Sequence, residues 1–214
     1  MTKAEERATE SLSHASRESL HEIALRHGTD KTLPRRSLAA TYDAALASRR
    51  DNAVSLLEIG VFEGASLRMW RDYFSEGRIY GLDRDPEAKR YEEARISIFL
   101  GDQEDRLILD TIIEQTGGLD LIIDDGGHRA RQQIGTLVYL WPHLRANGVY
   151  IVEDTHTSYL PSYDMAWRSP GSTIEFLKGV VDDVHAMWHD RFVSLAGVDS
   201  IHFHGETCLL KKAD

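Results

Sequence analysis

The chain has 214 residues, 42% hydrophobic and 28% charged, which is enough for one substantial hydrophobic core and short for two domains. Its net charge of −10 disfavours a nucleic-acid partner, and its single cysteine, Cys208, excludes an intramolecular disulfide and a cysteine-rich metal site. No apolar run approaches the roughly 20 residues that cross a bilayer, and the N-terminus lacks a secretory pattern, so we expect a cytoplasmic protein with no membrane partner.

Two helices are predicted at the start of the chain. In the first, over 3–26, Leu20 and Ile23 can share one apolar face, and Gly28 is placed to end the helix. The second is expected over 38–48.

Short apolar runs and helical segments then alternate along the chain. Strands are predicted at 54–59, 78–83, 96–100, 119–123 and 148–152, and helices at 65–74, 86–93, 105–115 and 129–140. This alternation is typical of an α/β fold, a parallel sheet with helices on both faces. All strands then end at one edge, where ligands of open α/β sheets bind.

The last part of the chain follows a different pattern. Residues 155–170 are rich in Ser, Tyr, Pro and Thr and are predicted to form a long loop that covers the substrate. A helix is expected over 173–189, followed by a closing antiparallel hairpin of 200–203 and 207–211. We interpret 1–50 as an N-terminal helical segment packed on the core and 51–214 as a single domain.

The loop after the first predicted strand favours one class of cofactor. Gly60 and Gly64 allow close approach of the backbone to a ligand, but their spacing is not that of a dinucleotide-binding loop. Glu63 would also place a carboxylate where a pyrophosphate should lie. S-adenosylmethionine, which carries a sulfonium and an ammonium group, tolerates acidic neighbours better.

An acidic residue lies at the end of each of the first three strands: Glu58, Asp83 and Asp102. Asp83 can accept hydrogen bonds from both ribose hydroxyls, and Asp102 can flank the adenine. The alternative is that the three residues only cap helices or solubilise loops.

A carboxylate cluster is predicted after the fourth and fifth strands, where Asp124-Asp125 and Glu153-Asp154 would face each other. Such close like charges need a cation, and oxygen ligands suit Mg²⁺. Alternatively, the aspartates cap the following helix and Glu153-Asp154 are ordinary loop residues.

The same cluster predicts a methyl transfer. Two substrate oxygens on the ion would lower the pKa of a hydroxyl and orient it toward the methyl group. His128 lies three residues beyond Asp125, close enough to take the hydroxyl proton as a general base. His156 is left open between a substrate contact, a cap and a metal ligand.

Several of these segments together resemble the macrocin O-methyltransferase-like branch of class I methyltransferases, metal-dependent enzymes that methylate deoxysugar hydroxyls. The resemblance runs from about Gly28 to Lys211 and is carried by the segments 57–74 (LEIGVFEGASLRMWRDYF), 81–83, 101–103, 122–128 (IIDDGGH) and 152–159 (VEDTHTSY), with weaker support from 28–31 (GTDK). It departs from the family pattern at Gly127, where the family usually has Ser, and at 32–37.

The resemblance implies a Rossmann-like fold with a mostly parallel seven-stranded sheet and the C-terminal hairpin at one edge. It implies that Asp125, Glu153 and Asp154 hold Mg²⁺ and that His128 is the base. The residues expected to bind S-adenosylmethionine are Glu58, Gly60, Gly64, Ser66, Asp83, Asp102, Gln103 and Asp124. His156 and Tyr159 are candidate substrate contacts, and relatives are commonly oligomeric, so a homo-oligomer is expected.

The sequence thus predicts an S-adenosylmethionine- and Mg²⁺-dependent O-methyltransferase acting on a small molecule, by analogy a sugar of a glycosylated natural product. Two alternatives stay open. One is a non-catalytic S-adenosylmethionine-binding partner in a biosynthetic complex, and the other is a nicotinamide-dependent oxidoreductase.

Overall fold

The computed structural model describes residues 17–33 and 38–214, so most of the predicted helix over 3–26 lies outside the described residues. Its described part is α2, Leu20–His27, which begins with a capping box between Ser19 and Glu22. The helix ends at Gly28, whose left-handed conformation at φ 68° confirms the predicted stop.

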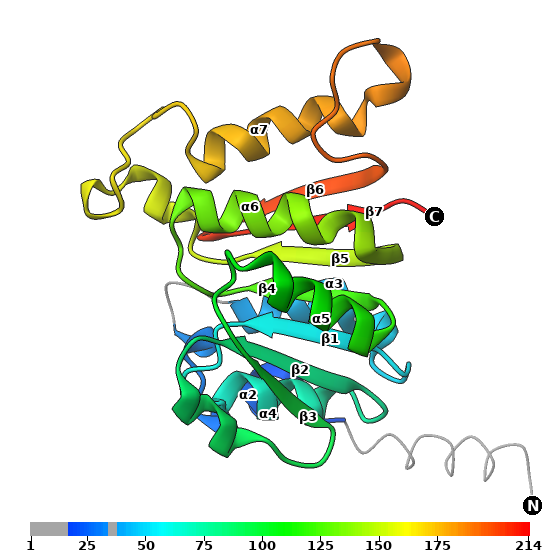
Figure 1. Cartoon of the computed structure of the whole chain (residues 1–214). Coiled ribbons are helices and arrows are strands. Elements are labelled where there is room, and N and C mark those ends of the chain that lie inside the picture. The colour runs from blue at the N-terminus through cyan, green and yellow to red at the C-terminus, as the bar shows by residue number, and fades with distance from the viewer. Residues whose placement is uncertain (1–16, 34–37) are drawn as a thin grey trace, which may run out of the picture.

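One seven-stranded sheet, in the order β3-β2-β1-β4-β5-β7-β6, organises the molecule (Figure 1). Neighbours from β3 to β5 are parallel, whereas β5–β7 and β7–β6 are antiparallel. The expected mostly parallel sheet with a closing hairpin is therefore confirmed. The strands are β1 Ser55–Ile59, β2 Arg78–Asp83, β3 Ile96–Leu100, β4 Leu119–Asp124, β5 Leu144–Val152, β6 Val198–His204 and β7 Thr207–Lys212.

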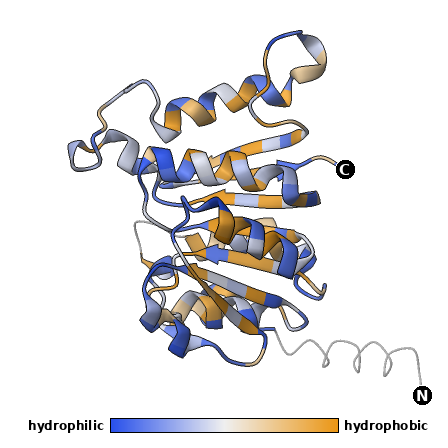
Figure 2. Cartoon of the chain, in the orientation of Figure 1, coloured by the Kyte–Doolittle hydropathy of each residue, from blue (hydrophilic) through white to orange (hydrophobic). Residues whose placement is uncertain are grey.

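Helices cover both faces of this sheet (Figure 1). They are α2, α3 Leu38–Leu46 and α4 Ala65–Tyr73 on one face, and α5 Arg106–Thr116, α6 Ala130–Leu140 and α7 Thr173–Val184 on the other. Because both faces are covered, β1 is buried along its whole length. Figure 2 shows the corresponding contrast between largely hydrophobic central strands and hydrophilic outer helix surfaces.

Two hydrophobic clusters, one on each face, share the strands between them. Trp70 of α4 lies in the first, where its ring is 5.7 Å from that of Tyr42 and 6.2 Å from that of Phe74. Trp141 lies in the second and donates a hydrogen bond to the carbonyl of Ala196. None of the helices among the described residues is long and apolar enough to span a bilayer.

Several segments differ from the predicted boundaries, among them β5, which was predicted to begin at residue 148 and begins at Leu144. Residues 86–93 form a 3₁₀ helix, η3 Pro86–Tyr91, and the predicted 155–170 loop contains two 3₁₀ turns, η5 Thr155–Tyr159 and η6 Pro161–Tyr163. The helix predicted to reach residue 189 stops at Val184. Near this point Asp183 accepts hydrogen bonds from the backbone of Ser194 and Leu195, which draws the following loop back against the helix.

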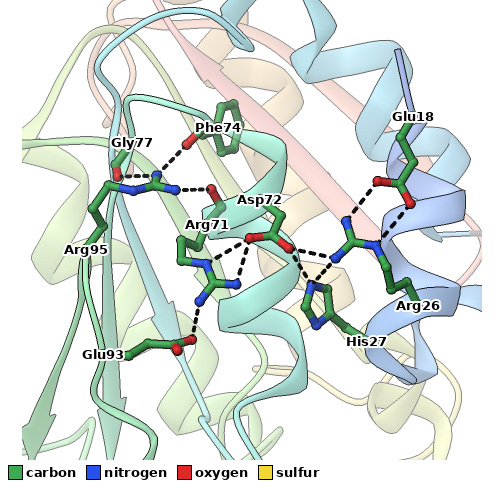
Figure 3. Close-up of polar contacts among 9 residues, drawn as sticks. All are labelled: Glu18, Arg26, His27, Arg71, Asp72, Phe74, Gly77, Glu93 and Arg95. Atoms are coloured by element: carbon green, nitrogen blue, oxygen red, sulfur yellow. Dashed lines mark hydrogen bonds and ion pairs between the residues drawn. The ribbon is translucent and has the colours of Figure 1, made fainter. Parts of the chain in front are cut away.

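A polar network fastens α2 to α4 (Figure 3). The Asp72 carboxylate of α4 accepts hydrogen bonds of 2.8 Å from both Arg26 and His27 at the end of α2. Arg26 also pairs with Glu18 at 2.8 Å, and Asp72 pairs with Arg71. The network thus fixes the point from which the chain leaves α2 toward the carboxyl edge of the sheet.

Candidate active site

The candidate site lies where the strand order changes direction, at the carboxyl ends of β1, β4 and β5. The parallel register pairs Ile59 with Asp124 and Asp124 with Val152, which aligns the three strand ends. Backbone bonds continue this alignment past the strands, from Asp125 N–H to Ile59 O and from Glu153 N–H to Asp124 O. The adjacency expected for the two acidic strand ends is therefore present.

A cavity of about 430 Å³ opens beside these strand ends. It is lined by Ile59, Gly60, Leu82, Asp83, Arg84, Gly101, Asp102, Gln103, Glu104, Gly126, Gly127, Arg129, Arg131 and Gln132. Four of the residues predicted to bind the cofactor are in this lining: Gly60, Asp83, Asp102 and Gln103. The other four, Glu58, Gly64, Ser66 and Asp124, do not line it.

Position 60 requires glycine, because the loop after β1 and the loop after β4 approach each other closely there. Its φ is +93°, and a Cβ at this position would lie 2.2 Å from the carbonyl oxygen of Asp125. Asp83 holds the same loop from the other side, because its Oδ2 accepts hydrogen bonds from the backbone of Val61 and Phe62. The rim of the cavity is thus fixed before any ligand binds.

Asp124 and Gln103 form a buried connection beneath the cavity. Gln103 Nε2 lies 3.1 Å from Asp124 Oδ1, and Gln103 Oε1 accepts a hydrogen bond from Gly127 N–H at 2.7 Å. Burial raises the pKa of the Asp124 carboxyl to about 7. Asp124 therefore supports the loops around the cavity through Gln103, whereas it was predicted to contact the cofactor.

Among the described residues, the remaining carboxylates and the nearby histidines form three groups of close ligand atoms; two of them share Asp125, and the third is Asp154, His156 and Glu206. In the first, one ligand atom each of Glu58, Asp125 and Glu153 lies within 4.8 Å of the other two, and in the second the same holds for Asp125, His128 and Asp154. Glu153 and Asp154 are adjacent in sequence but belong to different groups. Asp154 has the left-handed backbone conformation, with φ 53° and ψ 35°.

Lys31 was not assigned a role from the sequence, yet it lies at the centre of the first group. It belongs to the short turn η1 Asp30–Thr32, and its side chain is 1% exposed. Its Nζ is 2.7 Å from Glu153 Oε1, 3.1 Å from Asp125 Oδ2 and 3.4 Å from Glu58 Oε1. Because the contacts with Asp125 and Glu153 span 94 and 122 residues of chain, no local pattern could have revealed them.

The electrostatics of this group reflect burial and crowding of like charges. Burial opposes the charged form of Lys31, but the neighbouring carboxylates outweigh it and raise the pKa of the ammonium well above its usual value. Burial raises the pKa of both Glu58 and Glu153, and Asp125 adds to the effect while Lys31 opposes it. Glu153 Oε2 and both oxygens of Glu58 have no hydrogen-bond partner among the described residues. This donor set, oxygen-rich and short of positive charge, fits a hard divalent cation.

Asp154 lies between two imidazoles. Its Oδ2 is 3.4 Å from His128 Nε2, and its Oδ1 is 3.6 Å from His156 Nδ1. His128 Nδ1 is buried without a hydrogen-bond partner among the described residues, and Thr157 donates a hydrogen bond to the His128 carbonyl. Tyr159, at the end of η5, is 44% exposed and free to meet a ligand from solvent.

Comparison with known proteins connects this geometry to a chemistry. Residues 57–155 match a family model described as a methyltransferase domain. The chain is 36% identical, over 207 residues, to 8-demethyl-8-alpha-L-rhamnosyl tetracenomycin-C 2'-O-methyltransferase of Streptomyces olivaceus, an alignment that covers 89% of this chain and 53% of that protein. It is 34% identical to mycinamicin VI 2''-O-methyltransferase of Micromonospora griseorubida, covering 77% of this chain and 44% of that protein.

A solved structure agrees with these relatives. MycE methyltransferase in complex with Mg, S-adenosylhomocysteine (SAH) and mycinamycin VI superposes with a TM-score of 0.87 at 29% identity, covering 93% of this chain and 54% of that one. The chain therefore spans about half the length of the curated relatives it matches. The match to a methyltransferase domain also sets aside the nicotinamide-dependent alternative.

Proposed function

Because the chain belongs to the class I methyltransferases, in the branch of the macrolide and deoxysugar O-methyltransferases, we propose that it is an S-adenosylmethionine- and Mg²⁺-dependent O-methyltransferase. The observation that carries the proposal is the convergence of Asp125, His128 and Asp154, within 4.8 Å of one another, at the strand-order switch. Its acceptor is a hydroxyl of a small molecule, a sugar of a glycosylated natural product. The relatives, which are named as O-methyltransferases of glycosylated natural products, support this substrate class.

The cavity at the strand switch is the proposed S-adenosylmethionine site. Its volume of about 430 Å³ is in the range of small-molecule pockets. Asp83 and Asp102 place carboxylates in its lining, where they can accept hydrogen bonds from hydroxyl and amino groups. The other four residues predicted to bind the cofactor, Glu58, Gly64, Ser66 and Asp124, lie outside the cavity lining and stay predictions.

Asp125, Glu153 and Asp154 are the proposed metal ligands. When bound, Mg²⁺ supplies the positive charge that lowers the pKa of the acceptor hydroxyl. Asp125 and Asp154 flank the position where that hydroxyl reacts, and His128 accepts its proton. Asp154, 3.4 Å from His128 Nε2, stabilises the imidazolium that forms and orients the ring.

Further predictions concern the whole protein. The sequence and the resemblance support a cytoplasmic homo-oligomer. They also support one domain over 51–214 with the N-terminal segment packed on it. Light scattering coupled to size-exclusion chromatography tests the oligomer. His156 and Tyr159 remain candidate substrate contacts at the mouth of the site.

Isothermal titration calorimetry of SAH, with and without Mg²⁺, tests the proposal. We expect wild type to bind both, whereas Asp125→Ala/Asp154→Ala binds SAH but gives no Mg²⁺ signal. The matched control is Asp199→Ala, which removes an exposed carboxylate in β6 and should leave both signals unchanged. Absence of SAH binding in wild type contradicts the methyltransferase, and SAH binding with no Mg²⁺ response contradicts its metal dependence.

Turnover distinguishes the enzyme from a non-catalytic partner protein. Purified protein incubated with labelled S-adenosylmethionine and a panel of glycosylated natural products should transfer label to at least one acceptor. Tight SAH and Mg²⁺ binding without transfer to any acceptor of the panel favours the partner role.

A further inference from the structure

The first carboxylate group has the ligand types and spacing of a second metal position. Glu58, Asp125 and Glu153 offer ligand oxygens as close together as those of the second group, and Glu58 and Glu153 are almost completely buried. Buried carboxylates are rarely left without a compensating cation. Both groups share Asp125, so two divalent ions bridged by one aspartate are a chemically reasonable arrangement for this set.

Lys31 takes up the space of that second ion. Its ammonium lies 2.7–3.4 Å from one oxygen of each of the three carboxylates. An ion in the same position would need oxygens at about 2.0–2.1 Å for Mg²⁺ and would lie against the ammonium. Two cations cannot share this volume, because their mutual repulsion in a buried environment is large.

The ammonium is also held in place by its own segment. Thr29 caps the turn by accepting a hydrogen bond from the backbone N–H of Lys31, and both residues are buried. The preceding helix is fastened to α4 through Arg26, His27 and Asp72. Lys31 is therefore held in the cluster by its own segment as well as by the carboxylates.

We propose that Lys31 is a built-in cation that fills the Glu58–Asp125–Glu153 position and limits the site to one divalent ion, held by Asp125, Asp154 and the second carboxylate oxygen of Glu153, which has no hydrogen-bond partner among the described residues. This inference rests on the proposed metal site and adds the residue that sets its stoichiometry. Lys31 acts here as a positioning residue, because it orients the Asp125 and Glu153 carboxylates and does not itself contact the substrate. Its segment, residues 29–32, lies outside the 57–155 match to the methyltransferase domain.

The stoichiometry of Mn²⁺ binding tests this inference. After equilibrium dialysis, wild type is expected to retain one Mn²⁺ per chain, and Lys31→Met, which keeps the length of the side chain but removes its charge, is expected to retain two. In Lys31→Met/Glu58→Gln the vacated position loses one carboxylate, and the count should return to one. SAH titration of each variant verifies that the cofactor site is folded.

Two outcomes overturn the assignment. If Lys31→Met binds SAH but retains no more Mn²⁺ than wild type, Lys31 is only an anchor for the carboxylates. If the anomalous signal in Mn²⁺-soaked wild-type crystals places an ion among Glu58, Asp125 and Glu153, the lysine does not occupy that position. The crystal measurement decides even when a variant fails to fold.

The two proposals fail in different ways. No Mn²⁺ in wild type together with one ion in Lys31→Met refutes the metal-dependent mechanism but supports the role of Lys31. One ion in both proteins supports the metal site and refutes the role of Lys31.

Discussion

Asp125 connects the two carboxylate groups of the candidate site. It belongs to both carboxylate groups, contacts Lys31 through Oδ2, and its carbonyl oxygen lies against Gly60. A change at Asp125 therefore alters charge and loop geometry together. Substitutions at neighbouring residues test one role at a time.

His128 is such a residue. In His128→Gln we expect kcat to fall by about 10²–10⁴-fold, the usual contribution of a general base, because no other described imidazole is as close to Asp125. SAH and Mg²⁺ affinities should change little. The measurement is methyl transfer beside calorimetry, with His143→Gln, beyond the C-terminal end of α6, as the control. An unchanged kcat would remove His128 from the mechanism.

Gly60 carries a structural prediction. Gly60→Ala places a Cβ 2.2 Å from the Asp125 carbonyl and forces an alanine to φ +93°, so we expect the free energy of unfolding to fall by roughly 2–4 kcal/mol. Gly135→Ala is the matched control, because Gly135 lies inside α6 with nothing within 4 Å. Alanine there should stabilise the protein by roughly 0.5–1 kcal/mol. Urea unfolding of both variants gives the comparison, and equal effects would contradict it.

The helices α2 and α4 form a unit that positions Lys31. Burial opposes ionisation of Asp72, but hydrogen bonds from Arg26, His27 and Arg71 outweigh it, so the pKa of Asp72 lies below its ordinary value. A carboxylate with a lowered native pKa stabilises the fold fully above its unfolded pKa of about 3.9 and loses this contribution as pH falls toward the native value.

In Asp72→Asn we expect the free energy of unfolding at pH 6 to decrease by roughly 1 kcal/mol, a modest value because Arg26 is partly exposed. The difference from wild type should shrink below pH 4. Urea unfolding at pH 6 and pH 3.5 measures it, with Asp51→Asn as a control, since Asp51 is exposed and pairs with Arg17 outside this network. A difference that grows on acidification would contradict the pairing.

At the same scale, the limits of sequence-based prediction become clear. The strands β2 and β3 were predicted to the residue because apolar runs bounded by Gly and Asp define buried parallel strands. The 3₁₀ form of η3 and the early end of α7 were not predicted, since tertiary hydrogen bonds such as those of Asp183 decide them.

The candidate site was predictable in part for the same reason. Residues at strand ends are brought together by sheet topology, so Asp125 and Glu153 could be placed from order alone. Lys31 could not, because a single lysine in a short polar turn carries no periodic signal. The hydrogen bond between Gln103 and Asp124 could not be predicted either, because it depends on side-chain packing.

The two hydrophobic clusters make one cooperative unit of the whole molecule, since they share the same sheet. Trp70 and Trp141 report on one cluster each, whereas Trp167 and Trp188 are exposed. In a Trp167→Phe/Trp188→Phe background, Trp70→Phe and Trp141→Phe each leave one reporter. After each variant's own stability change is taken into account, fluorescence and far-UV circular dichroism should give coincident transitions. Separate transitions for the two probes would show that the faces unfold independently and would contradict a single domain.

The left-handed backbone of Asp154 implies that thermal stability and metal binding favour different residues at this position. Glycine adopts φ 53° without penalty, whereas an aspartate does so at some energetic expense. Asp154→Gly should therefore raise the melting temperature of the metal-free protein slightly while abolishing its Mg²⁺ signal. A laboratory screen for heat tolerance alone would accordingly favour loss of this carboxylate. Position 154 should therefore be left unchanged when the protein is stabilised by mutation.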